Sequence, residues 1–452
     1  MTSVRLVLTF FVAVCLARAA IAQEQATKVI WDFEQQGLGS QWSAIGKLSA
    51  AREPHEVAEQ PRAAKKDDLL PGGQVVKLDA QAGSYFATKK ELPRVAWERA
   101  ERVSFWVFRS AGEAKRDADC TFDLQFFDGA NRALFARKLV VKGSGWQQVE
   151  VPCEWIAPVN GRVGNWPAVN RLGFGFREES HLSVDGLQVD LNVKPRPALP
   201  LAAVVPIAFP KATEKEIKTA EREGFLVATN AAECKPDVVA DLLVPVVEKM
   251  NKDLPLLPAT SPARLLIFAT REEYEQFPPR LAQQFGKEAA IPKSNGFTIL
   301  GWATAGWDPQ QGEKRPVFVH EFVHSLIESR LQLANEQEWL QEGLATYYQL
   351  QIYPQKNVPE IVQAGLARGD FDMRKLTSGQ PIATTDYWQA ATLCSLLLRD
   401  PGYQPQLKEL ITALQQADST KLEPHLATVF KTDFNKLTAD WKKHCREAFP
   451  VK

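Results

Sequence analysis

The feature that most constrains this chain is an apolar segment, residues 317–327, which carries three polar groups that are costly to bury. His320, Glu321 and His324 form the pattern H-E-x-x-H within this segment. On a helix, the two imidazoles lie on one face, one turn apart. Because the rest of the segment is apolar nearly all round, the helix should be buried, and its polar groups then need a partner. The segment therefore predicts a buried helix built around a bound metal ion.

Glu342 supplies a further carboxylate from a second predicted helix. It lies eighteen residues after His324, within the sequence W-L-Q-E-G. Two neutral imidazoles, one carboxylate and an open fourth position suit a catalytic zinc ion. Glu321 is adjacent to the ligands without being one of them, so it is placed to take a proton from a metal-activated water. We therefore expect one zinc ion per chain, held by His320, His324 and Glu342.

Both helices have sequence signals for their first turns. Pro316 suits the first position of the first helix, where its missing N–H would have no partner in any case. Asn335 is expected to cap the second helix, with Glu338 three residues further on. Gly343 allows the backbone of the second helix to approach a neighbour closely. These signals favour two packed helices over a chance occurrence of a short pattern.

The combination of H-E-x-x-H and W-L-x-E-G resembles the gluzincin metallopeptidases, which include thermolysin and the aminopeptidase N type. The strong match covers residues 317–348. Residues 225–451 resemble the peptidase MA-like proteins of bacterial envelopes in the order of their elements. The resemblance implies an α+β zincin-like domain, zinc ligands at His320, His324 and Glu342, and a general base at Glu321.

Two departures from the gluzincin pattern are visible. The thermolysin pattern has an aspartate four residues after the third ligand, where this chain has Thr346. The partner that orients His320 is thus unassigned, although such partners normally exist. The G-x-M-E-N signature, with which aminopeptidases hold a free amine, is absent from the sequence. The pattern therefore favours an endopeptidase and gives no support to exopeptidase specificity.

Gluzincin-like enzymes often use a tyrosine or histidine from the helical half of the domain to stabilise an oxyanion. By order along the chain, Tyr387 is the candidate in this sequence. Tyr347, Tyr348 and His425 compete with it. The alternative is that Tyr387, at the start of a helix, is a packing residue.

The N-terminal part of the chain, residues 23–194, has the pattern of an antiparallel β-sandwich. Short runs rich in aromatic and branched residues are separated by turn signals, without intervening helices. The sequence resembles galactose-binding-type jelly rolls that accompany carbohydrate-active enzymes. The predicted strands are residues 29–33, 103–108, 120–127, 133–141, 146–151, 172–176 and 182–193.

Two tryptophans of this sandwich have two interpretations. If Trp155 and Trp166 are exposed, they are candidates for stacking on a sugar ring. If they follow the general tendency of large aromatic side chains, they belong to the core, and we prefer this interpretation.

A proline-rich stretch, residues 195–211, is predicted to be an extended and stiff linker. After it, residues 212–452 form the predicted peptidase domain. Strands are expected at 224–229 and 264–269, and helices at 232–252 and from 271. A single strand at 295–302 should line the cleft as the edge of the sheet, where the resemblance implies that an extended peptide binds by strand addition. Beyond Glu342 the chain should be mainly helical.

The N-terminus and the composition define the surroundings of this protein. Residues 1–22 have the pattern of a signal peptide, and no later segment is long enough to span a bilayer. The mature protein should therefore be exported, to the periplasm or the cell exterior. The 54 basic and 54 acidic residues give no electrostatic reason to expect nucleic acid as a partner.

Cysteines and the other histidines add little. After the signal peptide is removed, five cysteines remain, an odd number without metal-site spacing. Cys120 and Cys153 can pair in an oxidising compartment, but buried free thiols are the preferred interpretation. His55, His181 and His444 have no partner that the sequence identifies.

Three functions compete at this point. The first is an exported zinc endopeptidase with a β-sandwich accessory domain. The second is a carbohydrate-binding envelope protein whose zinc site is structural or retired. The third is a metallohydrolase that acts on glycosylated or cell-wall peptides. Glu321 favours the first over the second, since a structural site needs ligands but no base.

Overall fold

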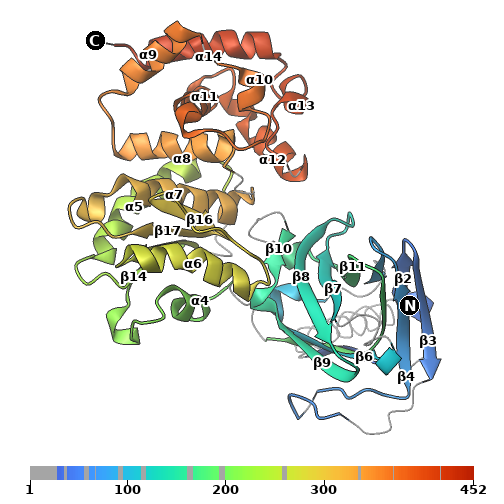
Figure 1. Ribbon diagram of the computed structural model, residues 1–452. Helices are drawn as coiled ribbons and strands as arrows, with labels where there is room; N and C mark the ends of the chain where they lie inside the picture. The colour runs from blue at the N-terminus through green and yellow to red at the C-terminus, as the bar shows by residue number, and fades with distance from the viewer. Residues whose placement is uncertain are drawn as a thin grey trace, which may run out of the picture. The chain divides into compact units, whose positions relative to one another are not determined.

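A computed structural model describes residues 28–34, 38–54, 61–66, 68–89, 95–112, 119–159, 166–192, 199–256, 262–333, 337–369, 371–417 and 419–451. The predicted signal peptide, His55 and the predicted cap Asn335 lie outside these ranges. The described residues up to Leu199 form one compact unit, called here the N-terminal unit. Those from Pro200 onward form a second, called here the C-terminal unit (Figure 1).

The N-terminal unit consists of two antiparallel β-sheets, which confirms the predicted sandwich (Figure 1). One sheet has the order β3-β4-β12-β6-β9, with β1 also paired to β12, and the other has the order β10-β8-β7-β11-β5-β2. The strands are β1 (Lys28–Trp31), β2 (Trp42–Ile45), β3 (Leu48–Pro54), β4 (Gln74–Ala80), β5 (Tyr85–Thr88), β6 (Ala100–Arg109), β7 (Asp119–Phe127), β8 (Ala133–Lys142), β9 (Gly145–Pro152), β10 (Ala157–Pro158), β11 (Arg171–Phe176) and β12 (Ser180–Leu191). Short helical turns are α2 (Leu38–Gln41), η1 (Trp97–Arg99), η2 (Cys153–Trp155) and η4 (Trp166–Ala168).

Alternation of side chains builds the core of the sandwich. Val103, Phe105 and Val107 of β6 are fully buried in it, as expected for residues at i, i+2 and i+4 of a strand. All seven predicted strands are present, whereas β2 to β5 and β10 were not predicted. Strand β3 lies at a sheet edge and is largely exposed, so its sequence lacks the apolar alternation that marks a half-buried strand.

The five described cysteines are buried and free. The bridge between Cys120 and Cys153, which the sequence left open, is therefore not formed in this structure. The preferred interpretation of these residues as small buried side chains is confirmed.

The C-terminal unit has a five-stranded sheet of order β13-β14-β15-β17-β16, in which β14, β15 and β17 are parallel and the two edge strands are antiparallel. The strands are β13 (Lys218–Arg222), β14 (Phe225–Thr229), β15 (Ala263–Phe268), β16 (Gly296–Ile299) and β17 (Trp302–Gly306). The helices are α4 (Leu201–Ala208), α5 (Pro236–Asp253), α6 (Arg271–Gln284), α7 (Pro316–Leu326), α8 (Trp339–Ile352), α9 (Val358–Arg368), α10 (Met373–Leu376), α11 (Tyr387–Arg399), α12 (Leu407–Ala417), α13 (Glu423–Leu426) and α14 (Phe434–Ala448). Shorter helical turns are η5 (Glu214–Glu216), η6 (Gly312–Lys314), η7 (Ile327–Leu331), η8 (Thr384–Asp386) and η9 (Gln404–Gln406).

The prediction of one strand over residues 295–302 is wrong. The segment forms β16 and then turns into β17, so that β16 is the antiparallel edge of the sheet. Leu300 and Gly301 occupy the turn with φ angles of 52° and 78°. Positive φ at both positions suits a tight hairpin turn, which is usually marked by Asn-Gly or Asp-Gly. Leucine rarely adopts positive φ, so Leu300-Gly301 did not signal this turn in the sequence.

The extended linker predicted for residues 195–211 is also corrected. Residues from Leu201 to Ala208 form the helix α4, which packs against α6. Val204 is fully buried, and the ring of Phe209 lies 5.2 Å from the ring of Phe268 in β15. Burial of these apolar side chains outweighs the preference of a proline-rich segment for an extended conformation. Helix α4 is therefore part of the C-terminal unit.

This packing predicts a difference between two fragments of the chain. A fragment of residues 200–452 should be more stable than one of residues 211–452, because the shorter fragment loses the buried side chains of Val204 and Phe209. The lost burial should cost about 3 kcal/mol and lower the melting temperature by roughly 6–12 °C. Differential scanning calorimetry of the two fragments measures this difference. Equal melting temperatures would show that α4 is a spacer.

Candidate metal centre

Helix α7 presents the two histidines from a buried position. Pro316 occupies its first turn, as predicted, and the apolar residues Phe318, Val319, Phe322 and Val323 are at most 1% exposed. The predicted apolar helix is thus confirmed. It continues into a short π-helical turn, η7, a distortion that occurs often at functional sites.

Helix α8 presents Glu342 from its first turn. Its N-cap is Glu338, whose carboxylate accepts hydrogen bonds from the N–H groups of Leu340 at 2.7 Å and Gln341 at 3.1 Å. The prediction of Asn335 as the cap is therefore wrong, since α8 begins after Glu338. Burial raises the pKa of Glu338 to about 7, against the opposing effect of these backbone bonds. The cap fixes the first turn of α8 and with it the backbone of Glu342.

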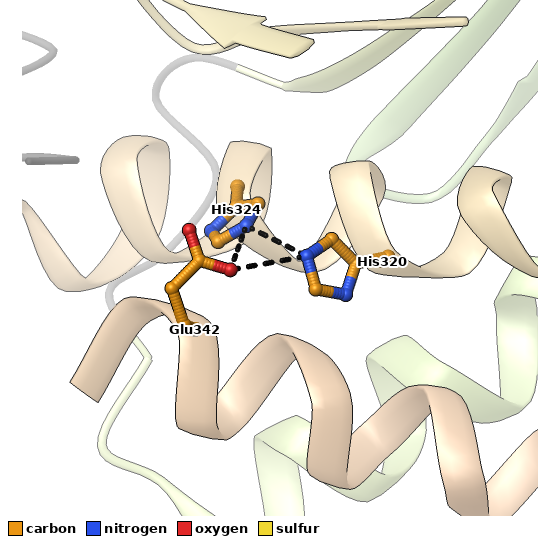
Figure 2. Close-up of side chains that lie close together, drawn as sticks. All are labelled: His320, His324 and Glu342. Carbon is orange, nitrogen blue, oxygen red and sulfur yellow. Dashed lines mark hydrogen bonds and ion pairs between the residues drawn. The ribbon is translucent and has the colours of Figure 1, made fainter. Parts of the chain in front are cut away.

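The three predicted ligands converge between α7 and α8 (Figure 2). The Nε2 atom of His320 lies 3.2 Å from Oε2 of Glu342 and 3.3 Å from Nε2 of His324. The third distance, between Nε2 of His324 and Oε2 of Glu342, is 3.6 Å. A tetrahedral zinc ion with bonds of about 2.0–2.1 Å would separate its ligand atoms by about 3.3–3.4 Å. The three side chains therefore fit a zinc ion without rearrangement.

The cluster is accessible from one side. The side chains of His324 and Glu342 are 4% and 5% exposed, whereas that of His320 is 15% exposed. The cluster is therefore buried at His324 and Glu342 and partly exposed to solvent at His320. An additional ligand or a substrate would approach past His320.

Charge complementarity among the three side chains is strong in the metal-free protein. Burial alone would lower the pKa of His324, but its hydrogen bond with Glu342 and the attraction of Glu342 and Glu321 raise it to about 9. Burial would raise the pKa of Glu342, but its hydrogen bonds with both histidines hold it well below its usual value. The carboxylate is therefore charged at neutral pH, as a metal ligand must be.

Gln341 orients His324, and the sequence did not predict this role. Its Oε1 atom lies 3.0 Å from Nδ1 of His324, and its Nε2 donates to the carbonyl of Leu333 at 3.2 Å. Because the amide N–H₂ is used by Leu333, Oε1 faces the histidine, and Nδ1 must donate the proton. In the neutral form of the imidazole, which a metal ion requires, the lone pair of His324 Nε2 is then directed at the cluster. The signal in the sequence was the position of Gln341 immediately before Glu342.

Thr346 does not replace the aspartate of the gluzincin pattern. Its Oγ1 atom is buried and has no hydrogen-bond partner among the described residues. It is therefore not the group that orients His320.

Glu321 is held beside the ligands by the edge strand β16. Thr298 donates a hydrogen bond from Oγ1 to Oε2 of Glu321 at 2.8 Å. Gly296 of the same strand packs on Glu321 so closely that an added Cβ would lie 2.5 Å from its Cγ atom. Burial raises the pKa of Glu321, although both histidines oppose this effect. The contribution of Thr298 and Gly296 was not predicted, because it depends on the hairpin that brings β16 onto α7.

Tyr387 is the aromatic candidate that lies at the cluster. Its ring is stacked on that of His320, with centroids 6.2 Å apart and an angle of 8° between the planes. Burial, together with the charge of Glu342 and a hydrogen bond to it, raises the pKa of Tyr387 well above its usual value. The phenol is therefore protonated at neutral pH and can donate a hydrogen bond.

The three competing candidates lie elsewhere. The hydroxyl of Tyr347 accepts a hydrogen bond from Arg399 Nε at 2.6 Å, and that of Tyr348 donates to Asp253 at 3.1 Å. Both tyrosines thus belong to a network around the ion pair of Asp253 and Arg399. His425 is on α13 and is not part of the ligand cluster.

The remaining predicted residues divide between core and surface. Trp166 is 7% exposed and stacks on Phe135 at 3.9 Å, so the core interpretation is confirmed for it. Trp155 is half-buried and outside the core cluster. His181 has partners after all, Asp79 at 2.8 Å and Glu179 at 3.1 Å, and Nε2 of His444 lies 3.0 Å from the hydroxyl of Ser395.

No protein-family model and no curated protein matches the chain. Solved structures similar to it include carbohydrate-binding β-sandwich modules, which correspond to the N-terminal unit. The family 11 carbohydrate-binding module of the cellulosomal cellulase Lic26A-Cel5E of Clostridium thermocellum is 12% identical, with 36% of this chain and 95% of that chain covered and a TM-score of 0.26. The CBM22-1 xylan-binding domain of Paenibacillus barcinonensis Xyn10C is 14% identical, with 36% and 92% covered and a TM-score of 0.24.

A third neighbour is the arabinose-bound MgGH51 α-L-arabinofuranosidase, 13% identical, with 40% of this chain and 29% of that chain covered and a TM-score of 0.26. The sandwich assignment rests on the observed strands and their pairing. In the described part of the chain, none of the helices has both the length and the apolar character needed to cross a bilayer.

The cluster predicts a zinc affinity that depends on pH. Zinc binds the neutral imidazole, so at neutral pH it must displace the proton of His324, whose pKa is about 9. The affinity should rise roughly tenfold for each pH unit up to about pH 9. Without zinc, the stability of the fold changes with pH in the opposite direction. The ion pair between protonated His324 and ionised Glu342 stabilises the fold below pH 6.5, and this stabilisation is lost as the pH rises through about 9, the pKa of His324. Calorimetric zinc titrations between pH 6 and 9 measure the first effect.

The ligand assignment is tested with variants in the same titration. His320→Ala, His324→Ala and Glu342→Ala should each lower zinc occupancy from about one per chain, while His444→Ala serves as a control outside the cluster and should bind normally. Full zinc occupancy in a variant that lacks both His320 and His324 would contradict the assignment.

Proposed function

We propose that this chain is a zinc-dependent hydrolase of peptide bonds, with His320, His324 and Glu342 as the metal ligands. The observation that carries the proposal is the convergence of these three ligand atoms at separations of 3.2–3.6 Å, with the carboxylate of Glu321 held beside them. A structural zinc site needs ligands only. A positioned carboxylate that is not a ligand favours a hydrolytic site.

The role of Glu321 follows from how it is held. When bound, zinc supplies a Lewis acid that polarises the substrate carbonyl and makes water more acidic. Glu321 accepts a proton from the attacking water and passes it to the departing amine. Burial raises the pKa of this carboxylate, which makes it a better proton acceptor, and the hydrogen bond from Thr298 keeps one oxygen fixed while the other is available.

Tyr387 and β16 support the same reaction. The phenol of Tyr387, protonated and stacked on His320, has a hydrogen bond with Glu342; when Glu342 binds zinc instead, the phenol would donate to the oxyanion that forms on the substrate carbonyl. Strand β16 is the last strand of its sheet. An extended peptide can therefore pair with it as an additional strand. Within this proposal, the glutamate, the tyrosine and the sheet edge act on one substrate segment.

The proposal extends to the place of action. Residues 1–22 have the pattern of a signal peptide, so we propose that the protein is exported. Substrates would then be peptides or proteins of the cell envelope or the exterior, including glycosylated or cell-wall peptides.

The general base is tested by Glu321→Gln. The amide retains the size of the side chain and can accept the hydrogen bond from Thr298, but it cannot accept a proton. Zinc content should be unchanged, while kcat for peptide hydrolysis should fall about 10²–10⁴-fold. Metal analysis by mass spectrometry and cleavage of a mixed peptide library measure both quantities.

Glu328→Gln is the matched control for this variant. Glu328 follows Glu321 by two helical turns, and burial raises its pKa to about 8 despite a hydrogen bond from the N–H of Gly301. It is mostly neutral at pH 7, and glutamine resembles that neutral form, so activity should persist. Wild-type turnover in Glu321→Gln would rule out the general-base role.

A second function is favoured for the N-terminal unit. Trp155 is half-buried, in contrast to Trp97 and Trp166 of the same unit, which are in the core. A half-exposed indole can stack on a sugar ring. We propose that this unit binds a polysaccharide through Trp155 and brings the hydrolase to an envelope substrate. Several of the similar solved structures are carbohydrate-binding modules, including one in complex with a β-1,3-1,4-mixed-linked tetrasaccharide, and this guides the choice of probe.

Trp155→Ala should weaken binding to xylan or mixed-linkage β-glucan about tenfold, because the stacking ring is lost. Affinity gel electrophoresis of the full chain measures the effect. Trp146→Ala is the control, because it removes a second half-buried indole of the same unit, one whose ring centroid lies 5.3 Å from that of Phe108. Loss of binding in the control alone would contradict the role of Trp155, and absence of binding in the wild type would exclude these two polysaccharides.

A further inference from the structure

Strand β16 holds Glu321, yet it is the last strand of its sheet and pairs only with β17. The strand has 4 residues, Gly296–Ile299. The ends of a short edge strand open readily, because few backbone hydrogen bonds and little burial oppose the opening. Gly296, which packs on Glu321, is the first residue of this strand. The position of Glu321 therefore depends on what fixes the chain just before β16.

The segment before β16, residues 287–295, is mainly exposed and contains neither helix nor strand. Its last part is bonded to the first turn of α6, a helix that packs against β15 and β17 of the same sheet (Figure 1). Arg271 donates from Nη1 to the carbonyl of Ser294 at 3.0 Å and from Nη2 to that of Pro292 at 3.4 Å. The hydroxyl of Tyr274 donates to the same carbonyl of Ser294 at 3.2 Å. Two side chains of α6, one turn apart, thus hold a carbonyl that lies two residues before β16.

Arg271 is itself fixed on α6 by two further contacts. Its Nε donates to Oε1 of Glu275 at 2.6 Å, and its guanidinium lies 5.1 Å from the centroid of the Tyr274 ring. Tyr274 is fully buried, with its ring 6.2 Å from that of Phe268 in β15. The side chain of Arg271 is 47% exposed. A buried aromatic ring therefore orients the guanidinium toward the segment, while the exposure of Arg271 means that a substitution there should not prevent folding.

The anchored segment leads directly to Glu321. Ser294 donates a hydrogen bond from its hydroxyl to the carbonyl of Gly296. A Cβ added to Gly296 would lie 2.5 Å from Cγ of Glu321 and 2.6 Å from its Oε1. Two residues further along β16, Thr298 donates to Oε2 of Glu321. Both carboxylate oxygens thus face β16, and a displacement of the start of this strand would allow the carboxylate to rotate.

We propose that Arg271 is a positioning residue for Glu321: it anchors the start of β16 and thereby fixes the carboxylate beside the three clustered side chains. The inference rests on the proposed hydrolysis and adds to it a residue of α6, which is not a member of the cluster. Small errors in the position of a reacting group are costly, since a misplacement of about 1 Å can lower a rate about 10²-fold. Arg271 therefore acts on turnover through Glu321.

Hydrogen–deuterium exchange of the full chain, with and without zinc, tests the anchor. In Arg271→Gln the side chain is too short to hold the segment, so the amides of residues 294–299 should exchange at least about fivefold faster. Arg222→Gln is the matched control. It removes an arginine of β13, the opposite edge strand, whose ion pairs are with Asp237 and Asp241, and it should leave exchange at residues 294–299 unchanged.

Peptide cleavage by the zinc-loaded full chain tests the effect on turnover. Arg271→Gln should lower kcat about tenfold, because the carboxylate of Glu321 is less well placed. KM should change less than about twofold, since the pairing of β16 with β17 remains. Arg271→Lys should restore part of kcat, because an ammonium can still donate to the carbonyl of Ser294 but cannot hold two carbonyls and a carboxylate as the guanidinium does. Zinc content should be unchanged in both variants.

A double variant separates positioning from a general loss of structure. If Arg271 acts through Glu321, then Arg271→Gln should change the residual rate of Glu321→Gln less than about twofold, because the group that it positions is already absent. A loss of about tenfold in both backgrounds would show independent effects, as expected for a structural role, and would overturn the inference.

The exchange measurement separates this inference from the proposed function. Faster exchange at residues 294–299 in Arg271→Gln, in a protein that cleaves no peptide, would refute peptide hydrolysis and support the anchor. Peptide cleavage by the wild type, with unchanged exchange in Arg271→Gln, would refute the anchor and leave the hydrolase. Faster exchange in Arg271→Gln with the kcat of the wild type would overturn the positioning of Glu321.

Discussion

The C-terminal unit depends on one constraint, the burial of two imidazoles and a carboxylate between α7 and α8. Such groups destabilise a fold unless each finds a partner of suitable charge and geometry. In the zinc-free protein His320, His324 and Glu342 satisfy one another through a shared set of hydrogen bonds and ion pairs. The same separations suit a zinc ion, so the positions in which the three side chains stabilise one another also fit a metal ion.

The surrounding residues fix the positions and orientations of the side chains at this cluster. Glu338 fixes the first turn of α8, Gln341 sets the tautomer of His324, and Thr298 holds Glu321. Each of these contacts comes from a different element, and β16 reaches α7 only because Gly296 has no side chain. Tyr387 stacks on His320 and also lines a cavity with residues of α8, α9 and α11. The three clustered side chains, Glu321 and Tyr387 are thus connected through a few direct contacts.

The two units differ in where they bury their charged groups. The N-terminal unit is a sandwich whose core is apolar, and on the outer face of one sheet the buried Arg102 pairs with Asp68 and Asp190. Hydrogen bonds from Arg102 and Gln148 hold the pKa of Asp68 at about 2 against the opposing effect of burial. The C-terminal unit instead buries its ionisable groups at the junction of sheet and helices. Chemistry is therefore expected in the second unit and recognition in the first.

The sequence by itself determined the elements that depend on local pattern: the sandwich strands of high alternation, the buried helix α7, and the side chains that meet between α7 and α8. It did so because residue type and spacing along one helix specify which side chains share a face. Tertiary structure decided the rest. The β16–β17 hairpin required positive φ at Leu300, the cap of α8 moved to Glu338, α4 became helical against α6, and Gln341 and Thr298 reached the site. These features arise from contacts between segments distant in the chain, which local sequence does not encode.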